Sequence, residues 1–297
     1  ETDLDQIEGF LPKYLANILL DHDFDAERSF RERGINRSVR FIACSGIVKN
    51  QILMKQIQDI MQLLQKEYEY PVDIEFTVNL SETGEYSINL LQCRPLKVFK
   101  DIGKAQIPED IAEEKIILEN VHSSMGLSRN VKIDHIVLVD PIAYYNMPYV
   151  RKTNVAKLIG TINWKYKGKN KHMLLMVPGR IGTSSPELGV PTTFADISEF
   201  EAICEIEEKK AGYNPELSYG SHIFQDLVEA EILYTAVFAN EKTLRFAPEK
   251  LAEYPDIVSL FTEDPELKQV VHVYDMSKVS CELCNDLQNE RLVLYQQ

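Results

Sequence analysis

The chain has 297 residues, of which 44% are hydrophobic and 26% are charged. This is an ordinary globular composition, and the length is enough for two domains with sizeable cores. Acidic residues outnumber basic ones by 46 to 32, and the net charge of −14 argues against nucleic acid and anionic membranes as partners. It does not exclude an anionic substrate held in a local basic pocket.

Cysteine usage and hydropathy indicate a cytoplasmic protein. The five cysteines are odd in number and mostly scattered, which is typical of reduced thiols rather than of a disulfide framework. No apolar run reaches the length of a membrane span, and we find no signal peptide. Because the sequence begins at Glu1 rather than at Met, we expect it to be a piece of a longer protein.

The first part of the chain contains both helical and extended patterns. Apolar residues recur with helical spacing in 1–20, where Pro12 favours a helix start. The charged stretch 21–38 predicts a surface helix and a loop, and 39–47 (VRFIACSGI) predicts a buried strand. A strong amphipathic helix is predicted over 50–67.

A β-hairpin is predicted between Pro71 and Pro95 (PVDIEFTVNLSETGEYSINLLQCRP). Its first arm alternates apolar and polar residues, the period of two expected of a strand with one buried face. The segment 81–84 has the residue types of a turn, in which Gly84 can adopt a positive φ. The second arm, Tyr86–Arg94, is rich in residues that favour strands.

The register of the hairpin decides which side chains share a face. We expect Leu80 to lie opposite Ser87, and a slip of two residues would leave the faces unchanged. One face then collects two carboxylates, an amide and a guanidinium. These groups belong to Asp73, Glu75, Gln92 and Arg94, with Glu75 opposite Gln92 and Asp73 opposite Arg94.

This set of groups fits a Mg-nucleotide site. Carboxylate and amide oxygens are hard ligands suited to Mg²⁺. A guanidinium suits phosphate, which it can bind through two parallel hydrogen bonds. The alternative is a solvent face with a cross-strand ion pair, which is common in hairpins and is favoured by the residues taken alone.

The sequences Asp73-Ile74-Glu75-Phe76 and Leu91-Gln92-Cys93-Arg94-Pro95 resemble the end of the ATP-grasp nucleotide-binding region of the phosphoenolpyruvate synthase and pyruvate phosphate dikinase family. The resemblance covers about 39–97. It implies Mg²⁺ and ATP as cofactors, with Glu75 and Gln92 holding the metal on the ATP phosphates. It also implies that Arg94 contacts the phosphates and acts in catalysis.

The segment 97–114 is polar and looks like a linker, so we predict one domain over 1–100 and an appended domain over 101–297. The second domain has a mixed α/β pattern. Predicted strands cover 115–119, 135–139, 172–177, 201–206, 270–274 and 291–295, and predicted helices cover 148–159 and 221–238. Gly160 is expected to end the first of these helices.

The segment Pro178–Pro191 (PGRIGTSSPELGVP) follows a predicted strand. Such a loop can turn several backbone N–H groups toward an anion, with Arg180 as the counter-charge and a candidate cofactor contact. It lacks the Gly-Lys-Ser/Thr of a P-loop and is not a dinucleotide fingerprint. The spacing alone favours a long connecting loop whose glycines only turn the chain.

This loop also resembles a segment of synthase-like proteins that carry an appended domain. The resemblance continues through 195–198 (ADIS), 203–205 (ICE) and 215–227 (PELSYGSHIFQDL), and it spans about 151–237. It implies an appended α/β domain of unknown role. True phosphoenolpyruvate synthases carry a phosphohistidine in a Thr-Gly-Gly-rich signature, which His222 lacks, so we interpret Ser221 as a helix cap and His222 as a first-turn residue.

Two further motifs have simple interpretations. Cys281 and Cys284 lack the two additional ligands of a zinc site, so we interpret them as half-buried helix thiols. Four lysines alternate between Lys165 and Lys171, beside Trp164. The indole could stack on a base, but a packed hairpin with a solvated strand edge or loop is the simpler interpretation.

We interpret the chain as the C-terminal part of a phosphoenolpyruvate synthase-like, ATP-dependent phosphotransferase. The fold class is α/β (α+β), the end of an ATP-grasp lobe followed by a mixed α/β domain. The family implies pyruvate or phosphoenolpyruvate as partners of the longer protein. Since the phosphohistidine and pyruvate-binding domains are missing from this sequence, we expect the chain alone to be inactive.

Two alternatives stay open. The longer protein can be a catalytically inactive nucleotide-sensing or regulatory module whose acidic second domain binds a partner. The hairpin can also be only a scaffold, with Asp73 and Arg94 in a structural ion pair.

Overall fold

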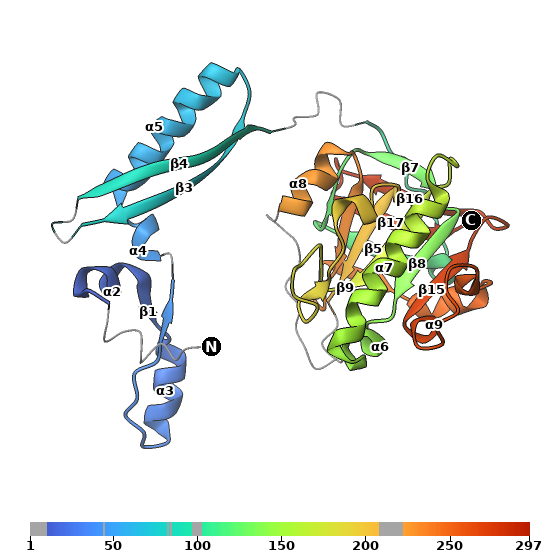
Figure 1. Ribbon diagram of the computed structural model, residues 1–297, viewed down its shortest axis with the longest axis horizontal. Helices are drawn as coiled ribbons and strands as arrows, with labels where there is room; N and C mark the ends of the chain where they lie inside the picture. Colours follow the sequence, from blue (N-terminus) through green and yellow to red (C-terminus); the bar gives the residue numbers. More distant parts are fainter. Residues whose placement is uncertain (1–10, 44, 82, 84, 97–102, 208–221) are drawn as a thin grey trace. The chain divides into compact units, whose positions relative to one another are not determined.

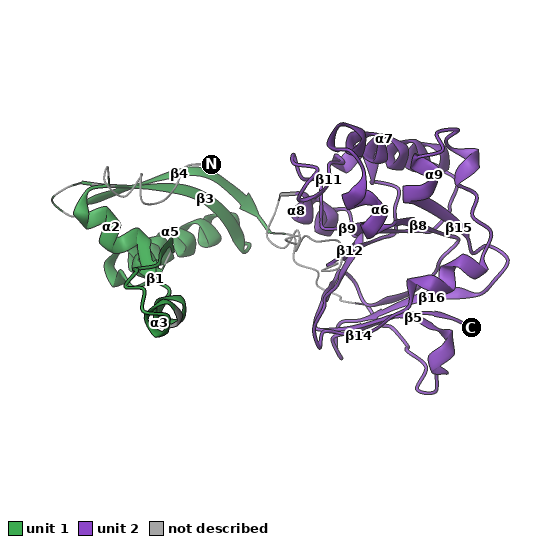
Figure 2. Ribbon diagram, turned by 90° about the horizontal axis from the view of Figure 1, so that it is seen from below, with its two compact units in different colours: residues 1–98 green, residues 99–297 purple. Residues whose placement is uncertain are grey.

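The computed structural model describes residues 11–43, 45–81, 83, 85–96, 103–207 and 222–297. The chain divides into two compact units, Glu1–Val98 and Phe99–Gln297 (Figures 1 and 2). Both units combine helices with β-structure, so the predicted α/β class is confirmed. None of the described helices is long and apolar enough to cross a membrane.

Unit 1 consists of short elements followed by a long helix and a hairpin. They are α2 (Lys13–Leu19), β1 (Leu20–His22), α3 (Phe24–Glu32), β2 (Arg40–Ile42), α4 (Ser45–Val48), α5 (Gln51–Tyr68), β3 (Val72–Leu80) and β4 (Tyr86–Pro95). Helix α2 begins after Pro12, as predicted. Helix α5 begins after Asn50, whose side chain accepts a hydrogen bond from the Leu53 N–H at 3.1 Å.

The prediction of a buried strand over 39–47 is wrong. Only Arg40–Ile42 is extended, and it pairs with β1 alone before the chain turns into α4. Its apolar side chains stay in solvent, with Phe41 47% and Ile42 67% exposed. An apolar run becomes a buried strand only where a second layer covers it, and no such layer covers β2 within the described residues.

The largest packed element of unit 1 is helix α5 against the β3–β4 hairpin (Figure 1). Leu53 near the start of α5 is 2% exposed, and Val72 at the start of β3 is 5% exposed. These two are the buried apolar side chains among the described residues of this unit. The hairpin therefore has one face toward a helix and one face that carries its polar residues.

Unit 2 has three layers (Figure 2). A six-stranded sheet, in the order β15-β8-β9-β12-β13-β6, lies between a layer of helices and a five-stranded sheet, in the order β14-β5-β17-β16-β7. The first sheet contains β6 (Ser124–Met125), β8 (His135–Val139), β9 (Met173–Pro178), β12 (Ala202–Ile206), β13 (Leu233–Val237) and β15 (Val271–Asp275). The second contains β5 (Ile116–Val121), β7 (Arg129–Lys132), β14 (Thr243–Phe246), β16 (Cys281–Asp286) and β17 (Arg291–Gln296).

The helical layer contains α6 (Pro141–Asn146), α7 (Tyr149–Tyr166), α8 (His222–Glu229) and α9 (Leu267–Val270). Short 3₁₀ helices lie at Glu113–Lys115, Phe194–Asp196, Pro248–Glu253 and Val258–Leu260. Strands β8, β9, β12 and β13 are parallel neighbours in chain order. Successive right-handed crossovers in one direction place their helices on one face, which leaves the other face for the second sheet.

The central strands are apolar on both faces because both faces are covered. In β8, Val137 and Val139 pack in the core beneath the helices. Ile136 and Leu138 pack in the core between the two sheets. A strand buried on both sides reads as a continuous apolar run, and this explains why β8, β9 and β12 were predicted close to their observed bounds.

Two helix predictions for unit 2 need correction. Helix α7 does not end at Gly160 but continues to Tyr166. The glycine is not a helix end: it allows the close approach of Asp196, since a Cβ at this position would lie 2.6 Å from Asp196 Oδ1. The helix predicted over 221–238 ends at Glu229, and Leu233–Val237 forms β13. Ser221, the predicted cap, lies outside the described residues, and His222 is the first residue of α8.

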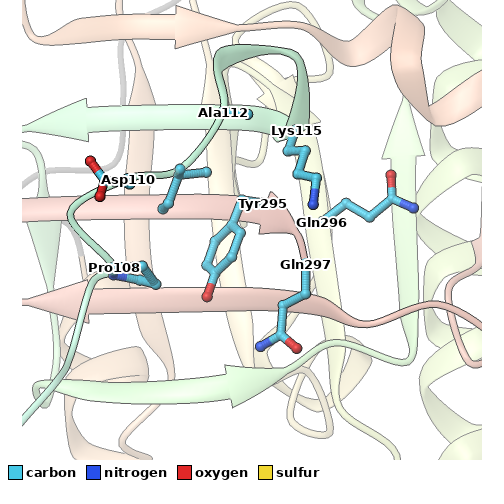
Figure 3. A pocket seen from close by; sticks show the side chains of 8 residues that line it. Pro108, Asp110, Ala112, Lys115, Tyr295, Gln296 and Gln297 are labelled. Carbon is cyan, nitrogen blue, oxygen red and sulfur yellow. The ribbon is translucent and has the colours of Figure 1, made fainter.

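The predicted linker is partly docked on unit 2. Residues 105–112, the strap, run across the outer face of the five-stranded sheet, where Ile107 and Ile111 pack beside Tyr295. The Gln106 N–H donates to Asn130 Oδ1 at 3.0 Å, and Asn130 Nδ2 donates back to the Gln106 carbonyl at 2.8 Å. A hollow of about 300 Å³ lies between the strap and the end of β17. Figure 3 shows the side chains that line it.

We predict that Gly189→Ala destabilises unit 2. Gly189 has φ 154°, and a Cβ there would lie 2.0 Å from the Arg180 carbonyl oxygen, so the backbone must move. We expect the free energy of unfolding to fall by about 3 kcal/mol in chemical denaturation.

Gly168→Ala is the matched control, because Gly168 has φ 69° and no atom within 4 Å of the added Cβ. This variant carries only the cost of left-handed backbone, about 1 kcal/mol. Equal losses in the two variants would contradict the steric argument.

Candidate functional site

The register of the hairpin changes once along its length. Near the turn, Leu80 pairs with Tyr86 and Asn79 with Ser87, so the predicted pairing of Leu80 with Ser87 is wrong by one residue. The Ser81 N–H donates to the Glu85 carbonyl at 2.8 Å and fixes the tighter register. Gly84 of the predicted turn lies outside the described residues.

Farther from the turn, the predicted pairs are present. Glu75 pairs with Gln92, and the pairing shifts between Phe76 and Glu75. Phe76 pairs with Leu90, so Leu91 is the extra residue of a β-bulge. Past the bulge, Asp73 lies opposite Arg94, as predicted from the sequence.

The bulge decides the face on which Gln92 and Arg94 lie. Side chains along a strand alternate, so a regular β4 would place Gln92 and Arg94 on the same face as Leu90. Leu90 pairs with Phe76, which belongs to the apolar set of β3. The extra residue at Leu91 reverses the alternation and brings the amide and the guanidinium to the polar face, beside Glu75 and Asp73.

The polar face is partly open to solvent. Arg94 Nη2 lies 3.7 Å from Asp73 Oδ2, and the two side chains are 29% and 35% exposed. A partly exposed pair at this distance contributes about 0.5 kcal/mol to stability, so it mainly orients the guanidinium. Glu75 is half-buried and Gln92 is exposed.

The donor set of this face suits a metal that arrives with its own oxygen ligands. Among the described residues, no group of three or more His, Cys, Asp and Glu side chains could hold a metal ion. Glu75 and Gln92 bring one carboxylate and one amide oxygen together as a cross-strand pair. Mg²⁺ is commonly held by one or two protein oxygens together with substrate phosphates and water, and this pair fits that pattern.

Comparison with known proteins finds one similarity in this region. Residues 18–115 match the family model described as pyruvate phosphate dikinase, AMP/ATP-binding domain. This part of the chain is therefore similar to the nucleotide-binding domain of that family. The match covers about a third of the chain and includes α5 and the whole hairpin. No curated protein and no solved structure matches the chain.

The structure places Arg180 in unit 2, in a loop held by its own backbone. Arg180–Ile181 (β10) pairs in parallel with Gly189–Val190 (β11). The Arg180 N–H donates to the Leu188 carbonyl at 2.9 Å, and the Gly182 N–H donates to the Val190 carbonyl at 3.0 Å. From the sequence, such a loop could turn its backbone N–H groups toward an anion. In the structure these two N–H groups instead bind carbonyl oxygens of the loop itself.

Two buried side chains that the sequence analysis did not single out anchor the same loop. Glu205, fully buried in β12, accepts hydrogen bonds from the Ile181 N–H at 2.8 Å and from the Tyr234 hydroxyl at 2.7 Å. The Tyr144 hydroxyl lies 2.7 Å from the Gly189 carbonyl oxygen. A glutamate inside an apolar strand was the available signal, because a buried carboxylate needs hydrogen-bond donors.

The cysteine pair has no shared site. Cys281 and Cys284 lie on strand β16, so the prediction of half-buried helix thiols is wrong. Their odd spacing places them on opposite faces: Cys281 packs in the core between the sheets, and Cys284 packs beneath the strap. Burial raises the pKa of each thiol to about 12.

We predict that both thiols resist alkylation in the folded protein. With a pKa of about 12, roughly one thiol in 10⁴ is ionised at pH 8, and only the thiolate reacts. Cys93 is half-buried and is expected to react far faster with iodoacetamide, as measured by peptide mass spectrometry. Alkylation of Cys281 or Cys284 at the rate of Cys93 would contradict their burial.

Proposed function

We propose that the polar face of the β3–β4 hairpin binds the phosphates of Mg-ATP, within a phosphoenolpyruvate synthase-like phosphotransferase. The observation that carries this proposal is the bulge at Leu91, which brings Gln92 and Arg94 to the face of Glu75 and Asp73. Bulges often re-aim side chains beside active sites. The family match supports an ATP-binding region here.

Each side chain has a distinct role in this proposal. Glu75 and Gln92 hold Mg²⁺, which neutralises charge on the phosphates when bound. Arg94 binds a phosphate oxygen and stabilises the charge that develops during transfer. Asp73 lies 3.7 Å from the guanidinium and keeps it oriented on this face.

Further parts of the proposal concern the longer protein and unit 2. Pyruvate or phosphoenolpyruvate is the proposed acceptor-side partner of a longer, cytoplasmic enzyme, and the chain alone is proposed not to turn over. Arg180 is proposed as a separate anion contact. It follows the carboxyl end of β9, the edge at which open α/β sheets commonly bind ligands.

We predict that Mg-ATP raises the unfolding temperature of unit 1 and that Arg94→Ala removes this effect. A ligand that binds only the folded state at about ten times its Kd stabilises by about 1.4 kcal/mol, or about 5–10 °C for a unit of this size. Differential scanning calorimetry resolves the transitions of the two units. The transition of unit 2 is the internal control, since the hairpin belongs to unit 1.

Arg28→Ala is the matched control for charge. Arg28 belongs to unit 1, its side chain is 71% exposed, and its ion pair with Asp25 is long, at 3.8 Å. This variant should keep the full nucleotide effect. Glu75→Gln should keep a response to ATP but lose the additional response to Mg²⁺. If wild type and Arg94→Ala respond equally, the hairpin face is not the nucleotide site.

We predict that deletion of Leu91 keeps the nucleotide effect. Without the extra residue, Gln92 follows Leu90 directly, so β4 alternates regularly and Gln92 and Arg94 stay opposite Glu75 and Asp73 on the polar face. Leu91→Ala is the control, because Leu91 is 63% exposed and its truncation should change stability by less than about 0.5 kcal/mol. Loss of the ATP-induced shift in the deletion variant alone would contradict the assignment of Leu91 as the extra residue of the bulge.

A further inference from the structure

The longest segment of this acidic chain without acidic residues lies in unit 2. Between Asp140 and Glu187 there is no Asp or Glu, while eight Lys and Arg residues occur there. The whole chain has a net charge of −14. Helix α7 and the turn that follows it lie in this segment, so the segment adds positive charge to the helical layer.

Several of these cations are occupied within unit 2. Arg151 is paired with Asp264 and with Glu266, the latter at 2.8 Å. Lys171 is paired with Asp134 at 2.9 Å. Lys165 Nζ donates to the Leu260 carbonyl at 2.9 Å. These residues serve the fold and leave little charge for a partner.

Three other lysines are exposed and have no carboxylate partner in the described part of the chain. They are Lys157, Lys167 and Lys169. The Glu199 carboxylate lies close to the turn that carries Lys167 and Lys169, but it binds the backbone there: Glu199 Oε2 accepts a hydrogen bond from the Gly168 N–H at 3.4 Å. These lysines are therefore exposed along the C-terminal half of α7 and the turn that follows it.

Two large apolar side chains are exposed on the two segments that the Lys165–Leu260 hydrogen bond joins. Trp164 is 72% exposed in the last turn of α7, where the sequence analysis expected a packed hairpin. Lys167 Nζ lies 5.2 Å from the centre of the indole ring. Leu260, which accepts the Lys165 hydrogen bond, is 63% exposed. We name Lys157, Trp164, Lys167, Lys169 and Leu260 the Trp164 patch.

Helix stabilisation explains only part of this patch. Lysines near the C-terminus of a helix interact favourably with its dipole, which accounts for Lys165 and contributes at Lys167. It does not account for Lys157 in the middle of the helix. It also does not explain the combination of an exposed indole and an exposed leucine with these lysines.

We propose that the Trp164 patch is a docking surface for an acidic protein segment that carries apolar side chains. Carboxylates of the partner pair with the lysines, which speeds encounter and fixes orientation. Its apolar side chains cover Trp164 and Leu260, and tryptophan is among the residues most often decisive at interfaces. A nucleic acid fits less well, because its long charged backbone would extend from three lysines onto an acidic chain.

The chain carries its own reporter, because Trp164 is its only tryptophan. The experiment titrates the whole chain with a peptide of repeated Glu-Glu-Leu triplets and follows indole emission. We expect a saturable blue shift as the indole leaves water, and weaker binding as salt is added. A peptide of repeated Gln-Gln-Leu triplets should bind at least about tenfold more weakly.

Matched charge reversals test the surface itself. The combined variant Lys157→Glu, Lys167→Glu and Lys169→Glu should weaken binding by about tenfold or more. The combined variant Lys104→Glu, Lys132→Glu and Lys278→Glu alters three exposed lysines elsewhere in unit 2 and should bind as wild type does. With a labelled peptide and fluorescence anisotropy, Trp164→Ala should also weaken binding.

Three results would overturn the proposal. One is an indole emission that does not change up to millimolar Glu-Glu-Leu peptide. Another is equal affinity of the two triple variants. The third is tighter binding of oligothymidylate than of the acidic peptide, which would assign the patch to nucleic acid.

Discussion

The alternation of side chains along a β-strand is the constraint on which the candidate site depends. Because the period is two, a one-residue bulge changes which residues of the strand share a face. In β4, even-numbered residues lie on the apolar face before the bulge and on the polar face after it. Leu91 is the extra residue of this bulge. It separates residues 86–90, whose register is set by the turn, from the end of β4 that carries Gln92 and Arg94. The polar face thus exists through a backbone irregularity rather than through any strong attraction, since the Asp73–Arg94 pair is long and partly exposed.

The two units differ in what holds them together. Unit 2 buries two large cores, one beneath its helices and one between its sheets, and a small cluster beneath the strap. Unit 1 has Leu53 and Val72 as its buried apolar residues in the described range, while Phe76, Leu90 and Leu91 of its hairpin are 37%, 44% and 63% exposed. Apolar burial is the dominant stabilising term, so unit 1 is the less strongly held. A ligand across its hairpin would therefore change its stability measurably.

The sequence predicted well where one physical rule decided the outcome. Strands buried on both faces, such as β8 and β9, were found close to their predicted bounds because apolar runs there face two cores. The Glu75–Gln92 pair was predicted from a regular ladder, and it is present because a one-residue error at the turn is offset by the bulge. Neither the tighter pairing at the turn nor the bulge at Leu91 has a sequence signal of its own. Leu233–Val237 was mistaken for helix because neighbouring strands, not local spacing, determine its conformation.

Net charge is a property of the whole chain, but partners meet local surfaces. At −14 the chain repels polyanions at long range, yet within a Debye length of about 8 Å the local lysines dominate the field that a partner encounters. Between Asp140 and Glu187 the sign of the chain is reversed, and helix α7 displays the excess together with an exposed indole. An acidic protein that carries a local basic patch repels extended anionic surfaces, but it can bind an anionic partner small enough to stay on the patch. Size, as well as charge, then selects the partner.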